Sequence, residues 1–126
     1  MKTLNKKTTK TLEKIIAGME PYTSKKIGEG GVYMALHVER LTETDYSLAH
    51  YYEQNGDMMA DPDMVFRKTD AGFVPLEITQ AGLGIYRRTC TFDENGEINA
   101  YRPGAVRELC SFASMWLENI KGQQGL

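Results

Sequence analysis

The sequence has little of what builds metal centres and thiol redox sites. It contains two cysteines, Cys90 and Cys110, and two histidines, His37 and His50, in 126 residues. The cysteines form no CxxC pair, so a zinc site or a redox motif has no support. We place Cys90 on a strand and Cys110 on the apolar face of a helix, where a thiol packs as a small hydrophobe. We therefore expect no cofactor.

Long hydrophobic runs are also absent. No stretch approaches the roughly 20 apolar residues that span a bilayer, and Met1–Lys14 is polar and lysine-rich, unlike a signal peptide. We expect a cytoplasmic protein without a membrane partner. The net charge of −2 and the pI of about 5.7 disfavour a protein that coats nucleic acid. The lysines of the first quarter nevertheless allow a local basic patch.

The length and the 41% hydrophobic content fit one globular domain over residues 1–126, with a loose lead-in at 1–7 and a frayed tail at 122–126. Thr8 or Thr9 is a candidate N-cap for a first helix that ends near Met19 or Glu20, before Pro21. A second helix is predicted from Pro103 or Gly104 to Lys121, ended by Gly122. Its buried stripe comprises Val106, Leu109, Cys110, Ala113, Trp116, Leu117 and Ile120.

Between the two helices, apolar and polar residues alternate in segments separated by short turns. The predicted strands are 32–41, 46–54, 64–68, 73–79, 85–92 and 98–102. We interpret the glycines Gly28, Gly30 and Gly31 as a hairpin or bulge, since a strand follows them, and Pro75 as a sign of an edge or a bulge. Short turns exclude parallel pairing. The fold class is α+β: an antiparallel meander of five to six strands with both helices packed on one face.

The densest stretch is His50–Met64, which holds one histidine and four carboxylates (Glu53, Asp57, Asp61 and Asp63). Oxygen-rich clusters suit Mg²⁺, Mn²⁺ or Ca²⁺. However, His50 and Glu53 have opposite strand parity, so their side chains should leave opposite faces. Turn chemistry offers a simpler interpretation, in which Asn55-Gly56 makes a turn, Asp57 or Asp61 caps backbone amides and Pro62 makes a second bend.

The same stretch carries a family resemblance. The runs Ser47–Asp57 and Asp61–Phe66, then Gly82–Tyr86 and the last helix with Trp116, resemble a domain of unknown function that bacterial conjugative transposons, plasmids and phages encode. The resemblance covers roughly Val32–Ile120. It implies an accessory protein of mobile DNA and transfers no catalytic residue.

Three functional hypotheses follow. The first is a non-enzymatic interaction module that contacts a protein partner or a second copy through the sheet face without helices and a candidate surface of His50, Tyr51, Tyr52, Glu53, Asn55, Asp57 and Asp61. The second is a small metal-dependent hydrolase or nuclease that uses His50, Glu53, Asp57 and Asp61, which requires these groups to converge. The third is a nucleic-acid accessory protein that uses the lysine-rich N-terminus.

Overall fold

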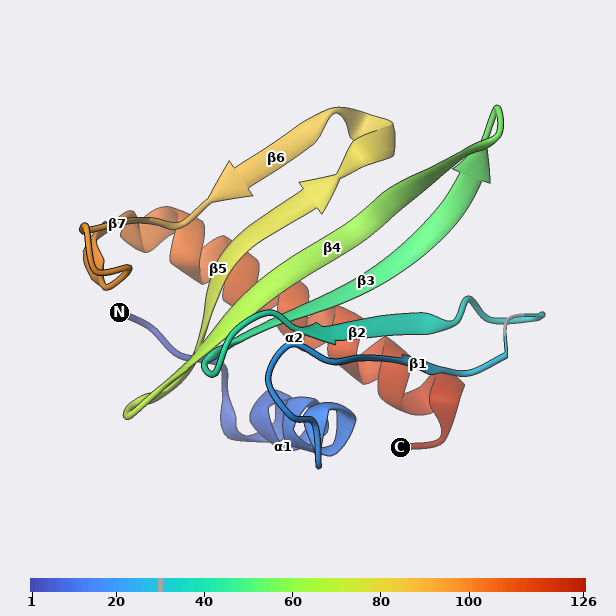
Figure 1. The fold of residues 1–126 in the computed structure, drawn as a ribbon, viewed down its shortest axis with the longest axis horizontal. Coiled ribbons are helices and arrows are strands. Elements are labelled where there is room, and N and C mark those ends of the chain that lie inside the picture. Colours follow the sequence, from blue (N-terminus) through green and yellow to red (C-terminus); the bar gives the residue numbers. More distant parts are fainter. Residues whose placement is uncertain (30) are drawn as a thin grey trace.

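The computed structural model describes residues 1–29 and 31–126 and confirms the predicted α+β class. Two helices, near the two ends of the chain, lie on one side of a curved sheet (Figure 1). The helices are α1 (Lys6–Ile16) and α2 (Pro103–Gln124). The strands of the large sheet are β1 (Ser24–Ile27), β2 (Leu36–Arg40), β3 (Asp45–Gln54), β4 (Asp57–Thr69), β5 (Gly72–Gln80) and β6 (Ile85–Arg88). A 3₁₀ turn, η1 (Ala81–Leu83), precedes β6, and β7 (Cys90–Phe92) and β8 (Ile98–Tyr101) form a small second sheet.

The strands follow one another in space in the order of the chain. The large sheet has the order β1-β2-β3-β4-β5-β6, and each neighbouring pair is antiparallel, which confirms the meander. Strand β1 was not predicted, and β2 begins at Leu36 rather than Val32. The segment that joins them carries the predicted glycine hairpin, of which Gly30 lies outside the described residues.

The predicted strand 85–92 is wrong as a single element, because it divides between two sheets. Thr89 is the division point: it is fully buried, its amide donates to the Leu76 carbonyl at 2.9 Å, and its hydroxyl donates to the Pro75 carbonyl at 2.7 Å. These bonds fix the chain where it leaves β6 and enters β7. The predicted strand at 98–102 is β8, which pairs with β7 instead of joining the large sheet.

Strand β4 begins at Asp57, so the second bend predicted around Pro62 is wrong. The chain passes through Asp61 and Pro62 inside the strand, opposite a register shift between Ala49 and Tyr51. The extra residues are accommodated as a bulge, which bends a strand without ending it. Pro75 lies at a second register shift, opposite Phe66, so its bulge is confirmed although β5 is an interior strand.

Both helices differ from the prediction at their ends. Asn5 caps α1, because its side chain accepts a hydrogen bond from the Thr8 amide at 2.8 Å, and the helix ends at Ile16. Helix α2 continues past Gly122 to Gln124, and Gly125, with φ +69°, is the C-cap. The predicted apolar stripe of α2 is buried in full. Among the residues that the structure describes, neither helix has the length and apolar character needed to cross a bilayer.

The core lies between the helices and one face of the sheet. Every second residue of the central strands enters it, as strand alternation requires. The strands contribute Leu36, Val38, Leu48, Met64, Phe66 and Ile78, and the helices contribute Leu12, Ile15, Val106, Ala113, Leu117 and Ile120. The alternate residues of the same strands therefore face away from both helices.

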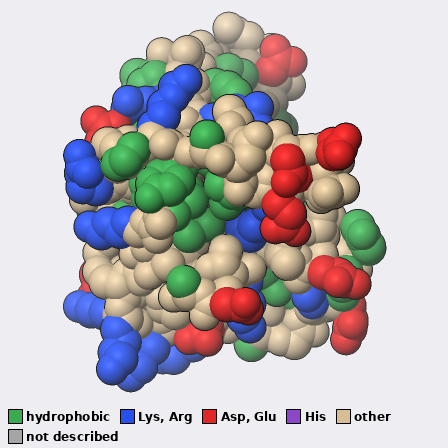
Figure 2. Space-filling view, turned by 90° about the vertical axis from the view of Figure 1, so that its left-hand side faces the viewer, with side chains coloured by type: hydrophobic (Ala, Val, Ile, Leu, Met, Phe, Trp, Pro, Cys, Tyr) green, Lys and Arg blue, Asp and Glu red, His purple; other side chains and the backbone are tan. Residues whose placement is uncertain are grey.

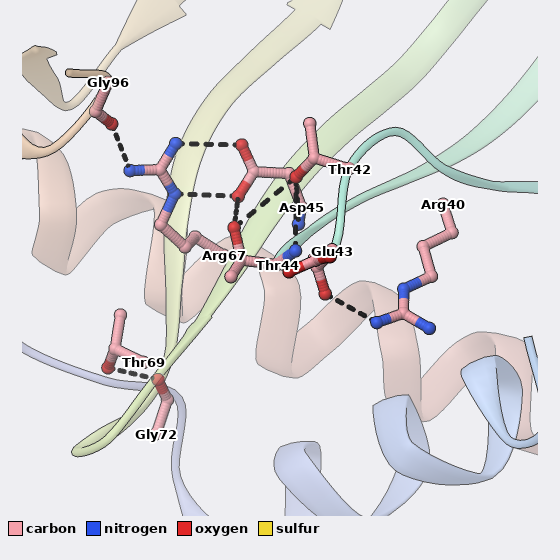
Figure 3. Close-up of polar contacts among 9 residues, drawn as sticks. All are labelled: Arg40, Thr42, Glu43, Thr44, Asp45, Arg67, Thr69, Gly72 and Gly96. Atoms are coloured by element: carbon pink, nitrogen blue, oxygen red, sulfur yellow. Dashed lines mark hydrogen bonds and ion pairs between the residues drawn. The ribbon is translucent and has the colours of Figure 1, made fainter. Parts of the chain in front are cut away.

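The Arg67 side chain fastens the small sheet to the large one. The Arg67 guanidinium on β4 holds the Asp45 carboxylate with two hydrogen bonds of 2.7 and 3.0 Å, and it donates a third, of 2.8 Å, to the Gly96 carbonyl (Figure 3). The same guanidinium lies over the Phe92 ring, 4.9 Å from its centroid. One side chain thus connects the start of β3, strand β4 and the β7–β8 hairpin.

Candidate binding surface

The face of the large sheet that carries no helix is called the open face here. Two cross-strand rows define it, since residues paired across neighbouring strands share a face. One row holds His37, Ala49, Asp63, Thr79 and Tyr86; the other holds Glu39, Ser47, Val65, Glu77 and Arg88. Polar and aromatic side chains predominate in both rows, in contrast to the apolar face beneath them.

Asp63 is the central acidic group of the open face. Its carboxylate accepts a hydrogen bond of 2.8 Å from the Ser47 hydroxyl. Burial raises the pKa of Asp63 above its ordinary value against the opposing effect of the Ser47 hydrogen bond, and the nearby Glu77 and Glu39 raise it further. The sheet therefore gathers three carboxylates, and one of them holds its proton more tightly than a free aspartate.

Beside this cluster the open face is hollowed between β1, β2 and β3. The depression has a volume of about 340 Å³, and its lining includes Lys26, His37, Ser47 and Tyr51. The His37 and Tyr51 rings meet edge to face with centroids 5.1 Å apart. Burial, with Asp63 and Glu39 nearby, raises the pKa of the Tyr51 hydroxyl, which stays protonated at neutral pH as a donor. The depression thus offers donors, acceptors and ring edges to a ligand.

The β3–β4 hairpin extends the open face and contains most of the predicted site residues. It projects at the upper right of Figure 1. Asn55 and Gly56 form its turn with φ values of 52° and 86°, as predicted. Glu53 pairs with Met58 and Gln54 pairs with Asp57, and all four side chains are exposed.

Tyr52 and Asp61 lie together at the base of this hairpin, against η1. A Cβ built on Gly82 would overlap the Tyr52 hydroxyl oxygen and would lie 3.7 Å from Asp61 Oδ2. The absence of a side chain at Gly82 is what allows this approach. The contact fixes the base of the hairpin on the turn that precedes β6.

His50 lies on the opposite face, inside the core. It is 6% exposed, and its Nδ1 accepts a hydrogen bond of 3.4 Å from the Trp116 indole. The buried Nε2 has no partner among the described atoms. Burial, with a smaller effect of His37, lowers the pKa of His50, so the imidazole is neutral and carries its proton on Nε2.

The groups required by the metal-dependent hydrolase hypothesis are therefore separated. His50 is in the core, Asp61 lies at η1, and Glu53 and Asp57 are exposed near the hairpin tip. Within residues 1–29 and 31–126, no group of three or more His, Cys, Asp or Glu side chains is arranged to hold a metal ion. The strand parity that separated His50 from Glu53 in the sequence is what separates them here.

Sequence reasoning missed the residues that neighbouring strands bring to Asp63. Ser47, Glu39 and Glu77 are distant along the chain and meet only through the sheet register. The available signal was strand alternation, which places His37 and Glu39 on the face opposite Leu36 and Val38. Strand alternation predicts which face of the sheet a residue lies on, but not which residues of the neighbouring strands lie beside it.

Comparison with known proteins gives a family. No curated protein and no solved structure matches the chain. A family model described as "Domain of unknown function (DUF6908)" matches residues 7–126. The chain therefore belongs to this family, DUF6908, a domain of unknown function.

Proposed function

We propose that this protein is a non-enzymatic binding module and that the open face, continued by the β3–β4 hairpin, is the surface that contacts a partner protein. The observation that carries the proposal is the asymmetry of the sheet. One face is sealed by α1 and α2, whereas the other is covered at one end by β7 and β8 and exposes polar and aromatic side chains on its outer strands, His37 and Glu39 on β2 and Tyr86 and Arg88 on β6. Aromatic residues mixed with polar groups are typical of protein contact surfaces.

The hairpin supplies the apolar part of this surface. Met58 is 64% exposed and Tyr51 is half-buried, and the register places both on the open face. Methionine is a flexible side chain that adapts to a partner's shape, and tyrosine combines a large apolar ring with a hydroxyl. Tyr52 and Met59 pair with each other on the opposite face of the hairpin and do not belong to this surface.

The cellular setting belongs to the proposal as well. The runs Ser47–Asp57 and Asp61–Phe66 resemble sequences that bacterial conjugative transposons, plasmids and phages encode. The module would therefore act in the bacterial cytoplasm as an accessory protein of a mobile genetic element. Both runs lie along β3 and β4, the strands of the hairpin that the proposal uses.

Site-specific photo-crosslinking in cells that carry the element tests the contact surface. A benzophenone amino acid replaces Met58 in one variant and Met115 in the other, and covalent adducts are identified by mass spectrometry. The pair is matched, because Met115 lies on α2 and is 54% exposed, close to the 64% of Met58.

We expect Met58 to capture one protein reproducibly and Met115 not to capture it. Purified, that protein should bind the wild type and lose at least tenfold in affinity with Met58→Asp. Equal capture from both positions would contradict the proposal. A crosslinked dimer of the chain itself would identify the surface as a self-association interface and exclude a different partner protein.

A further inference from the structure

A large hollow lies away from the open-face depression, between the edge strand β6 and the first turns of α2. Its volume is about 1220 Å³, above the range of roughly 300–1,000 Å³ that small-molecule sites occupy. Ile78, Ile85 and Phe112 contribute to its lining. Its size suits an extended chain better than one small ligand.

Four arginines and one glutamate are the charged residues that line this groove. Arg87 pairs with Glu108 at 2.7 Å. In the part of the chain that the structure describes, Arg88, Arg102 and Arg107 form no ion pair. Arg88 shares the open face with Glu77, so the side that faces α2 carries a net charge of about +2, from Arg102 and Arg107, in a protein whose formal net charge is −2.

The start of α2 adds to this positive field instead of neutralising it. Its first turn contains no acidic residue, and Arg102, the N-cap, makes no side-chain capping bond. The Arg107 side chain folds back over that turn, since its Nη2 lies 3.8 Å from where a Cβ on Gly104 would be. Cations beside a helix N-terminus are unfavourable, and a bound anion would reverse that cost.

Charge is unevenly distributed at this end of the molecule. Most of the Lys and Arg side chains visible in Figure 2 lie on its left side and most of the Asp and Glu side chains on its right, with a hydrophobic patch between them. An anionic chain would therefore meet an attractive and a repulsive side, which favours one path across the surface.

One tyrosine completes the groove. Tyr101, at the end of β8, is 45% exposed and lines the groove together with Arg102 and Arg107. Tyr86 of β6 belongs to the open-face row beside Thr79, so its ring faces away from α2. Exposed rings beside a cationic track are the combination with which proteins hold unpaired bases and their phosphates.

From these features we infer that the groove between β6 and α2 binds single-stranded nucleic acid. Arginine forks hold phosphates in a bidentate manner, and Tyr101 stacks on a base that a duplex would keep paired. An acidic peptide would satisfy the arginines and leave Tyr101 without a role. The site is separate from the proposed protein contact, because Tyr86 and Arg88 belong to the open-face rows and not to the side of β6 that faces α2.

Fluorescence anisotropy with a labelled twelve-nucleotide oligothymidylate tests this inference at 50 to 200 mM NaCl. Three variants are compared with the wild type: Arg102→Ala/Arg107→Ala, Tyr101→Leu, and Lys6→Ala/Lys10→Ala as the control. The control removes the same two charges from exposed positions on α1. All replaced residues are exposed, and a thermal melt verifies each fold.

We expect the double arginine variant to bind at least tenfold more weakly, with a salt slope smaller by about 1.4, since each phosphate contact on a single strand contributes about 0.7. Tyr101→Leu should lose at least fivefold with an unchanged salt slope. The α1 control should stay within twofold of the wild type.

The inference is overturned by an absence of binding at 50 mM NaCl or by equal losses in the arginine and lysine variants. It is also overturned if a duplex binds as tightly as the single strand, or if a polyglutamate peptide competes as well as the unlabelled oligonucleotide. Neither Arg102 nor Arg107 belongs to the open face, so this result and the crosslinking result are independent.

Discussion

The Trp116 indole on α2 donates a hydrogen bond of 3.4 Å to Nδ1 of His50 on β3, and the two rings meet edge to face at 90°. This contact joins the long helix to β3 between Ala49 and Tyr51, where the register with β4 shifts. It also determines the role of His50, which the metal-dependent hydrolase hypothesis used as a site residue because it lies in the acidic stretch. The imidazole is a neutral core residue that positions the base of the hairpin.

The first prediction is a loss of stability at mildly acidic pH that depends on His50. Because its pKa is lowered in the folded state, the unfolded chain takes up the proton first as the pH falls below about 6.5. The free energy of unfolding should be highest above that pH. It should fall as the pH drops toward the folded-state pKa, by no more than about 1.4 kcal/mol per pH unit from this one group.

Urea denaturation of His50→Gln between pH 7.5 and 5.0 measures this effect. The variant should show a flatter profile than the wild type, since glutamine does not titrate. His37→Gln, at an exposed position on β2, is the matched control and should retain most of the slope. Asp63 titrates in all three proteins, so its contribution cancels in the comparison. Identical profiles for wild type and His50→Gln would contradict the prediction.

The second prediction concerns Arg67, which pairs with Asp45 in the large sheet and also holds the small sheet. The Arg67 and Asp45 side chains are only 17% and 12% exposed. Arg67→Met should therefore lower the free energy of unfolding by about 3 kcal/mol, because it leaves the Asp45 carboxylate buried without its partner. Denaturant titration checks the value.

Two further variants interpret that result. Asp45→Asn/Arg67→Met should recover part of the loss, since the unpaired charge is gone. Lys7→Met removes a pair with Glu118 whose side chains are 69% and 49% exposed, and it should cost less than about 0.5 kcal/mol. A loss at Arg67 as small as that at Lys7 would show that the fork does not hold the small sheet.

The third prediction tests the contact between η1 and the hairpin. Gly82→Ala should destabilise the fold by about 1–2 kcal/mol, because its methyl group would overlap the Tyr52 hydroxyl. Combining it with Tyr52→Phe should restore part of the stability by removing that oxygen. If the double variant is no more stable than Gly82→Ala, the overlap with the hydroxyl is not the cause.

The fourth prediction concerns the glycines at the end of α2. Gly122 is helical, and a methyl group added to it would meet no neighbouring atom within 4 Å, so Gly122→Ala should raise the free energy of unfolding by about 0.5–1 kcal/mol. Gly125 has φ +69°, and Gly125→Ala should lower it by about 1 kcal/mol. Thermal melts distinguish the two. A loss of stability at Gly122 would mean that the helix ends there.

Sequence patterns predicted the elements with strong periodicity. The stripe of α2 from Val106 to Ile120 repeats over several turns and was identified in full. Strand β1 was not predicted, because Ser24-Lys25-Lys26-Ile27 has no apolar alternation. It is a strand because it pairs with the edge of β2. The division of segment 85–92 at Thr89 was not predicted either. A buried threonine that bonds to β5 looks, in the sequence, like any other strand residue.

The two candidate surfaces show the same limit. Strand alternation separates the residues of the open face from those of the core. The contact between Ser47 and Asp63, however, depends on the register of β3 and β4, which a bulge shifts. The groove depends even more on tertiary packing, because the packing of α2 against the sheet is what brings Glu108 to Arg87 of β6. Such neighbours follow from how the helix crosses the sheet, which no local pattern contains.

The most direct test of the proposed contact surface is an amide chemical-shift titration of the ¹⁵N-labelled protein with the partner captured through Met58. We predict shifts in β2 to β5 and the β3–β4 hairpin, centred on Tyr51 and Met58, with little change in α1 or around Met115. Shifts confined to α1 and the exposed side of α2, with the open face unchanged, would contradict the proposal.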